Sequence, residues 1–210
     1  MGQKINPKIL RLGPLFNWSS RWFDDKTYKE VLLEDYRVRK ILQDKLKNAG
    51  VSEIQIERSI NSIKIIIFVS RPGMVIGRGG TGLEELKNFL QTFLKKSGKI
   101  AKFDLRVEVE PVKEPNLDAY LVAKNISDQL IRRLPQKRVI SSTAEKVMGS
   151  GAKGVRIVLS GRIGGAEISR REKIQKGTVP LSTIREQINY ASVPALTKKG
   201  YIGVKVWINK

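Results

Sequence analysis

Cysteine and histidine are both absent from the 210-residue chain. Without cysteine, the protein has neither disulfide bonds nor thiolate metal ligands. Without histidine, it lacks the commonest general base and a frequent metal ligand. Other residue types can still support catalysis, so an enzyme is disfavoured rather than excluded. We expect no catalytic residues, no bound metal, no cofactor and no small-molecule substrate.

Long apolar runs are absent as well. The longest, Ile65–Val69, is far short of the ~20 residues that a membrane-spanning helix requires. The basic stretch Met1–Gly13 has no apolar segment of signal-peptide length. These features predict a soluble, cytoplasmic protein with no membrane partner.

Acidic residues are scarce relative to basic ones. The 20 Asp and Glu residues stand against 40 Lys and Arg residues, which gives a formal net charge of +20 and a pI near 10.3. So large a charge repels itself unless a polyanion offsets it, and each cation placed on a phosphate releases a condensed counterion. Nucleic acid is therefore the first candidate partner; an anionic membrane surface, the second, is disfavoured by the missing apolar segments. With 40% hydrophobic residues, the chain has enough apolar side chains for a packed core.

Apolar periodicity divides the first half of the chain into a basic arm and a compact domain. Residues 1–27 form the arm, whose Trp- and Phe-rich continuation has no clear period. Residues 28–111 alternate between the spacing of helices and the spacing of strands. The expected elements are a helix over Tyr28–Ala49, strands over Ser52–Arg58 and Ile63–Ser70, a helical turn over Met74–Ile76, a helix over Thr81–Lys96 and a strand over Phe103–Val109.

A short charged linker between Pro111 and Pro115 is the best domain boundary in the chain. Beyond it, Asn116 is expected to cap a helix, and a second helix is expected over Gln136–Met148. Four strands follow, of which the one over Ala166–Lys176 is polar on both faces. The sequence thus predicts an α+β protein, with a three-stranded sheet and packed helices in residues 28–111. Residues 112–210 are expected to form a second domain of two helices and a four-stranded sheet.

The loop Gly77-Arg78-Gly79-Gly80 lies between the predicted helical turn and the next helix. Its Gly-x-x-Gly pattern and the element order around it together resemble a KH domain of the second topological type. In such a domain the backbone amides of the loop approach the sugar-phosphate backbone of RNA, and Cβ atoms would hold that backbone away. Two alternatives remain open. Gly77-x-Gly79-x-x-Gly82 also fits a dinucleotide-binding fingerprint, and the loop also fits a plain helix entry without a ligand.

Basic residues gather at three places. One cluster occupies the junction of the two C-terminal helices: Arg132, Arg133, Lys137 and Arg138. A second surrounds glycines that would let the backbone approach RNA: Arg162, Gly164, Gly165, Arg170, Arg171, Lys173 and Lys176. The arm contributes Lys4, Lys8 and Arg11, which we expect to become ordered only on a polyanion. Phosphate-facing patches are favoured, with a solvated helix face and an ordinary hairpin turn as alternatives for the first and second clusters.

Longer motifs give a more specific resemblance, which covers nearly the whole chain. They are similar to the bacterial S-three family of small-subunit ribosomal proteins. The segments that carry the resemblance are Met1–Pro7 with Arg11–Gly13, Arg71–Gly77, Ser160–Ile168 and Gly203–Ile208. The resemblance implies a ribosome-bound protein that contacts small-subunit ribosomal RNA (rRNA) in the head, beside the messenger RNA (mRNA) entry channel. It also implies neighbouring head proteins as partners and a part in unwinding structured mRNA.

In that family, basic side chains at the start of the second C-terminal helix face the incoming mRNA. Lys137 and Arg138 match two of these positions, and the third holds the uncharged Ser141. We expect the arm and the Arg162–Arg171 region to anchor the protein to rRNA. Two other functions remain open, namely a free KH-type RNA regulator and a nucleotide-dependent enzyme built on the glycine loop. The second lacks the G-x-x-x-x-G-K-[ST] motif that would support it.

Overall fold

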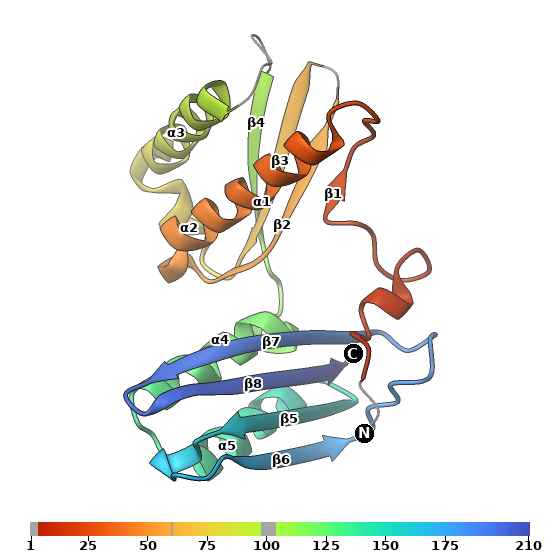
Figure 1. The fold of residues 1–210 in the computed structure, drawn as a ribbon, viewed down its shortest axis with the longest axis vertical. Helices are drawn as coiled ribbons and strands as arrows, with labels where there is room; N and C mark the ends of the chain where they lie inside the picture. Colours follow the sequence, from red (N-terminus) through yellow and green to blue (C-terminus); the bar gives the residue numbers. More distant parts are fainter. Residues whose placement is uncertain (1–3, 60, 98–103) are drawn as a thin grey trace. The chain divides into compact units, whose positions relative to one another are not determined.

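The computed structural model describes residues 4–59, 61–97 and 104–210, and it divides into two compact units (Figure 1). Trp18–Lys113 form the first, here called the glycine-loop unit. Glu114–Lys210 and the described residues up to Asn17 form the second, here called the C-terminal unit. The expected arm of residues 1–27 is therefore shared between the two units.

The glycine-loop unit packs its helices on one face of a mixed four-stranded sheet of order β1-β2-β3-β4 (Figure 1). The central pair β2 and β3 is antiparallel, whereas β1 and β4 run parallel to their neighbours. In chain order the elements are β1 (Ser20–Arg21), α1 (Tyr28–Lys45), β2 (Val51–Arg58), β3 (Ser62–Val69), α2 (Pro72–Ile76), α3 (Thr81–Ser97) and β4 (Asp104–Pro111). The helices and strands expected from periodicity are confirmed, while Phe103, the expected start of the last strand, lies outside the described residues.

One apolar core holds this unit together. Alternate residues of β3, such as Ile65 and Ile67, point toward the helices and are almost completely buried. Leu42 of α1 and Leu90 of α3 meet them and are equally inaccessible. The continuous apolar run of β3 therefore marks a central strand, as its sequence indicated.

The two-residue strand β1 is the element that the sequence did not predict. Ser20 and Arg21 pair in parallel with β2, and a buried carboxylate on α1 holds this segment in place. Asp35 is 0% exposed and accepts hydrogen bonds from Ser20 Oγ (2.8 Å), Trp22 Nε1 (2.9 Å) and the guanidinium of Arg58 (2.8 and 2.6 Å). A buried charge is tolerated only when it is paired and hydrogen-bonded in this way.

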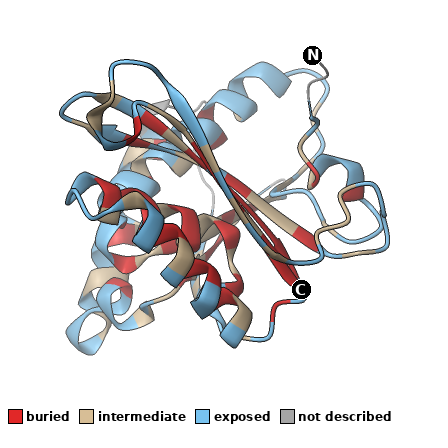
Figure 2. Ribbon diagram, turned by 90° about the horizontal axis from the view of Figure 1, so that it is seen from below, coloured by how far each residue is buried: buried red, intermediate tan, exposed pale blue. Residues whose placement is uncertain are grey.

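The C-terminal unit is an antiparallel four-stranded sheet of order β6-β5-β8-β7, with α4 and α5 on one face (Figure 1). The elements are α4 (Ala119–Ile131), α5 (Gln136–Gly149), β5 (Gly154–Gly161), β6 (Arg170–Gly177), β7 (Ile188–Thr197) and β8 (Gly200–Asn209). Val155, Ile157 and Leu159 point to the helices and are 0% exposed. Figure 2 shows the buried residues along the central strands and the exposed ones in the loops. Two helices and four strands were expected, and this fold class is confirmed.

The N-terminus of α4 is capped by a different residue from the one expected. The carboxylate of Asp118 accepts hydrogen bonds from the backbone N–H groups of Tyr120 and Leu121. Asn116 instead lies in a short 3₁₀ turn over Pro115–Leu117, and its side-chain amide donates to Ser150 Oγ at 3.0 Å. Both residue types are good caps, so the sequence alone could not choose between them.

Residues 4–17 belong to the C-terminal unit because of one buried arginine. Arg11 is 0% exposed, and its guanidinium donates to backbone carbonyls both nearby and about 170 residues away. The acceptors are the carbonyl oxygens of Pro7, Pro180, Leu181, Thr183 and Glu186, at 2.7–3.4 Å. Arg11 therefore joins the N-terminal segment to the loop between β6 and β7.

Candidate nucleic-acid interface

The glycine loop joins α2 to α3 through backbone that a side chain would strain. Gly77, Gly79 and Gly80 have φ values of 71°, 62° and 84°. A Cβ at Gly77 would lie 3.0 Å from the backbone nitrogen of Gly82, whereas Gly79 and Gly80 have nothing within 4 Å of that position. The second half of the loop is thus bare backbone facing open space, which a bulky polyanion can approach closely.

The dinucleotide-binding interpretation of this loop is wrong. The helix α2 separates the loop from its preceding strand, and the sheet is mixed rather than doubly wound and parallel. Gly82, the third glycine of that pattern, serves packing, since a Cβ there would lie 2.8 Å from the carbonyl oxygen of Val75. Arg78 is exposed at the tip of the loop and supplies its positive charge.

A second exposed group of cations lies where α4 ends and α5 begins; we call Arg132, Arg133, Lys137 and Arg138 the junction patch. Pro135 stands at the N-cap of α5 without a side-chain cap, and no acidic residue lies in the first turn. The positive end of the helix dipole therefore coincides with Lys137 and Arg138, an unfavourable arrangement unless an anion binds there.

Arg133 is the one residue other than glycine, among those the structure describes, with a positive φ (62°). It follows α4 in the left-handed position where helices commonly end in glycine, and Leu134 N–H closes the turn on the Gln129 carbonyl. An arginine there costs on the order of 1 kcal/mol relative to glycine. Strain of this kind often marks a side chain with a function, which agrees with the position of Arg133 in the junction patch.

One face of α5 continues from Lys137 through Ser141 to Glu145. Ser141 Oγ lies 3.5 Å from Glu145 Oε1, and Lys176 of β6 donates to the same carboxylate oxygen at 3.0 Å. The hydrogen bond and charge of Lys176 lower the pKa of Glu145, so this carboxylate is ionised and paired. The positive charge of this face therefore ends one turn after Lys137.

The second basic cluster does not form one surface, because the register of the sheet divides it. Arg171 and Lys173 lie on the outer face of the sheet, opposite the helices, with Lys205 of β8. Lys176 points toward the helices and Glu145. Arg162, Gly164 and Gly165 line a cavity on the other side of β5, and the exposed Arg170 begins β6. Lys205 was missed because only the strand register places it on the same face as Lys173, on the other side of Val158 of β5.

Among the arm residues, Arg11 has a fully buried guanidinium that is bonded to backbone carbonyls. This geometry favours a structural role over the rRNA contact expected from the sequence. Lys4 is exposed, and Lys8 is half-buried with its ammonium 5.5 Å from the centre of the Phe16 ring. The described part of the arm makes contacts with its own chain through Arg11 and Lys8, and its ordering by a polyanion stays a prediction.

The described residues contain no group of three or more acidic, His or Cys side chains placed to hold a metal ion. None of their helices has the length and apolar character to cross a membrane.

Comparison with known proteins agrees with these features across the whole chain. Residues 37–117 match the KH domain family model, and residues 126–208 match that of the ribosomal protein S3 C-terminal domain. The chain is 46% identical to the small ribosomal subunit protein uS3 of Desulfitobacterium hafniense, covering all of this chain and 93% of that protein. It is 44% identical to uS3 of Desulfosudis oleivorans, covering all of this chain and 95% of the relative. The chain therefore belongs to the uS3 family, whose members are RNA-binding structural proteins of the small ribosomal subunit and not enzymes.

Proposed function

We propose that this small-subunit protein binds rRNA in the head and guides incoming mRNA with the junction patch. The observation that carries the second part is the placement of Arg132, Arg133, Lys137 and Arg138, all exposed, around an uncapped helix N-terminus. Both features attract phosphate, and neither is neutralised by an acidic residue in the first turn of α5. The resemblance of the start of this helix to its family counterparts supports mRNA as the strand bound there.

The rRNA contacts are assigned to other cations of the C-terminal unit. Arg170 and Arg171 are exposed on β6, and Lys173 and Lys205 lie on the outer face of the sheet, on opposite sides of Val158 of β5. Lys4 adds a charge from the N-terminal segment. Arg162, Gly164 and Gly165, first expected to meet rRNA, line a partly apolar cavity instead, which suits a neighbouring head protein better.

The mechanism needs no chemical step by the protein. Cations fixed on a rigid helix hold the phosphates of one mRNA strand while the subunit moves along it. A paired strand cannot follow through the same contacts, so the duplex ahead is opened mechanically. Because Ser141 is neutral and Glu145 is paired with Lys176, the cations of α5 that hold the mRNA phosphates lie in its first turn and no further along this face.

Replacing Lys137 and Arg138 with alanine should slow translation of mRNA with a stable hairpin more than that of unstructured mRNA. The reason is that both lost charges lie where the strand is held, whereas decoding does not use them. The measurement is elongation rate on matched messages, in ribosomes assembled with the variant chain. Equal slowing on both messages would refute the proposed grip.

The matched control is the double variant Lys29→Ala, Lys40→Ala. It removes the same net charge from exposed positions of α1 in the glycine-loop unit. If this variant shows the same selective slowing, total charge rather than the junction patch determines unwinding.

The glycine loop is expected to add one phosphate contact through Arg78. For Arg78→Ala, the slope of log K against log salt for single-stranded RNA should fall by about 0.7, the value for one contact. The measurement is fluorescence anisotropy of the isolated full chain with a labelled oligonucleotide. Lys95→Ala, an exposed position near the end of α3, is the control and should change the slope less. An unchanged slope in Arg78→Ala would mean that the loop does not hold RNA.

A further inference from the structure

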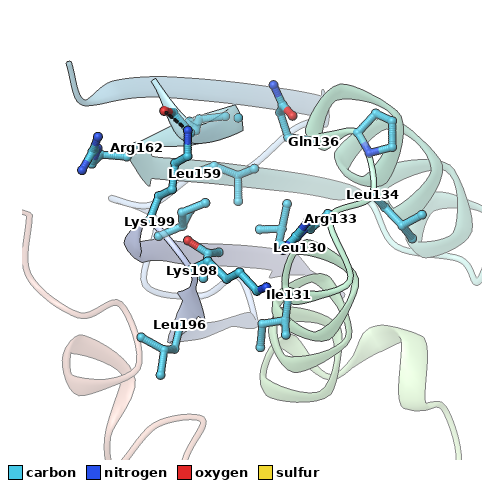
Figure 3. A pocket seen from close by; sticks show the side chains of 16 residues that line it. Leu130, Ile131, Arg133, Leu134, Gln136, Leu159, Arg162, Leu196, Lys198 and Lys199 are labelled. Carbon is cyan, nitrogen blue, oxygen red and sulfur yellow. Dashed lines mark hydrogen bonds between the residues drawn. The ribbon is translucent and has the colours of Figure 1, made fainter. Parts of the chain in front are cut away.

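The C-terminal unit contains an open cavity of about 510 Å³, and of its lining residues only Arg133 belongs to the proposed RNA contacts. It lies between the end of α4, the turn after β5 and the turn between β7 and β8 (Figure 3). Its size is that of a pocket for a small ligand or a large side chain. The floor consists of core residues that the fold itself buries: Leu130, Leu159, Ile163 and Ile202.

Exposed aliphatic side chains surround the mouth of this cavity. Ile131, Leu134 and Leu196 are 48%, 46% and 59% exposed, although each has the size of a core residue. Single exposed apolar residues are common, but three around one cavity form a continuous apolar surface with the floor. Such a surface is typical of protein–protein contacts.

The charged residues that line the cavity are all positive: Arg133, Arg162, Lys198 and Lys199. No Asp or Glu is among the lining residues, all of which the structure describes. Lys199 folds over the turn after β5 and donates to the Gly165 carbonyl at 3.4 Å (Figure 3). Arg162 donates to the Ala166 carbonyl at 2.9 Å. These bonds hold the cations at the edge of the cavity, where they attract carboxylates.

The occupant could in principle be a flipped nucleobase or a peptide. Bases bind on aromatic side chains or arginine planes and use hydrogen bonds to their edges. The lining has no aromatic residue, and of its two arginines Arg162 is bonded to the Ala166 carbonyl while Arg133 belongs to the junction patch. Gln136 and Thr197 are its only side-chain amide and hydroxyl. The aliphatic mouth and floor, in contrast, match a bulky apolar side chain of a peptide.

From these observations we infer that the cavity binds a peptide segment of a neighbouring small-subunit protein. The segment inserts one bulky apolar side chain between Ile131, Leu134 and Leu196 and places flanking carboxylates on Lys198, Lys199 and Arg162. The inference rests on the proposed partnership with neighbouring head proteins, and it assigns that partnership a site and a chemistry. It also explains why Gly164 and Gly165 lie against Gln136 and Lys199 rather than open to RNA.

The test places a photoreactive benzoylphenylalanine at position 196 of the full chain and assembles it into small subunits. Only purified subunits that contain the variant are irradiated, so membership of the subunit is established before crosslinking is measured. The expected product is a crosslink to a protein segment that has a bulky apolar residue with Asp or Glu within about three positions. A crosslink to RNA, a crosslink to a peptide without carboxylates, or no crosslink at position 196 would overturn the inference.

Two comparisons make the result specific. The same probe at Ile184, which is 51% exposed but does not line the cavity, should not give this crosslink. Adding Lys198→Glu and Lys199→Glu to the probe at position 196 should reduce the crosslink about tenfold, because the carboxylates would then meet like charge. An unreduced yield would show that the charges at the edge play no part. The outcome is independent of mRNA unwinding, which the Lys137→Ala, Arg138→Ala ribosomes report separately.

Discussion

Replacing Asp35 with asparagine is expected to lower the free energy of unfolding of the glycine-loop unit by about 3–5 kcal/mol, the usual loss when one member of a buried ion pair is removed. The carboxylate is 0% exposed, so water does not take its place beside Arg58. The amide keeps the shape of the side chain but leaves the guanidinium partly unpaired, with Glu34 at 3.1 Å as its remaining partner. Its NH₂ group also takes the place of one acceptor oxygen, so it opposes the donors either of Arg58 or of Ser20 and Trp22.

Hydrogen exchange of the full chain would measure this effect on one unit at a time. We expect the amides of β2 to lose protection in Asp35→Asn, while those of β8 keep theirs. The control is Glu57→Gln, which breaks the exposed ion pair between Arg21 and Glu57 on the same pair of strands. That pair is expected to contribute less than about 1 kcal/mol. Wild-type protection in Asp35→Asn would mean that the fold does not depend on the buried charge.

Replacing Arg11 with methionine is expected to destabilise the C-terminal unit by about 3 kcal/mol. Several backbone carbonyls would lose their donor at once, and an unsatisfied buried acceptor costs about 1–3 kcal/mol. Methionine is long enough to fill much of the same space, so the loss reflects hydrogen bonds more than an empty cavity. Because the acceptors span Pro180 to Glu186, the loop between β6 and β7 should respond first.

The measurement is hydrogen exchange over residues 180–187 and, in parallel, urea unfolding of the full chain. Lys4→Met is the matched control, since it removes one positive charge from an exposed position in the same segment. If Arg11→Met and Lys4→Met behave alike and RNA affinity alone falls, then Arg11 is an RNA ligand after all and its burial has no structural role.

Most helices and strands could be predicted from the spacing of apolar residues, because each of these elements buries the apolar residues on one of its faces. Strand β2 alternates through Ile54 and Ile56, β3 is a continuous apolar run, and α3 carries Leu86, Leu90 and Leu94 at helical spacing. β1 escaped prediction because two residues have no period and are held by side-chain hydrogen bonds to Asp35. The same limit applies to Arg11, since its acceptors lie far along the chain and a basic residue in a basic segment looks like an RNA ligand.

The candidate site was predicted in part. Residues close together on one loop or one helix turn, such as Gly77–Gly80 and Lys137 with Arg138, are neighbours in the structure as they are in the sequence. The basic residues of β6 were expected to form one surface, but adjacent strand residues point to opposite faces of the sheet. Arg171 and Lys173 therefore lie on one face and Lys176 on the other. The cavity could not be foreseen, since its lining comes from α4, the turn after β5 and the turn after β7.

The arginine that joins the N-terminal segment to the loop between β6 and β7 also sets an order of events during synthesis. Arg11 leaves the ribosome early, but its partner carbonyl at Glu186 is 175 residues further along the chain. At ~5–20 residues per second, that partner is made on the order of ten seconds or more later. The glycine-loop unit, which is continuous in sequence, can fold during this interval. The N-terminal segment then waits, still unattached and positively charged, until the last strands are complete.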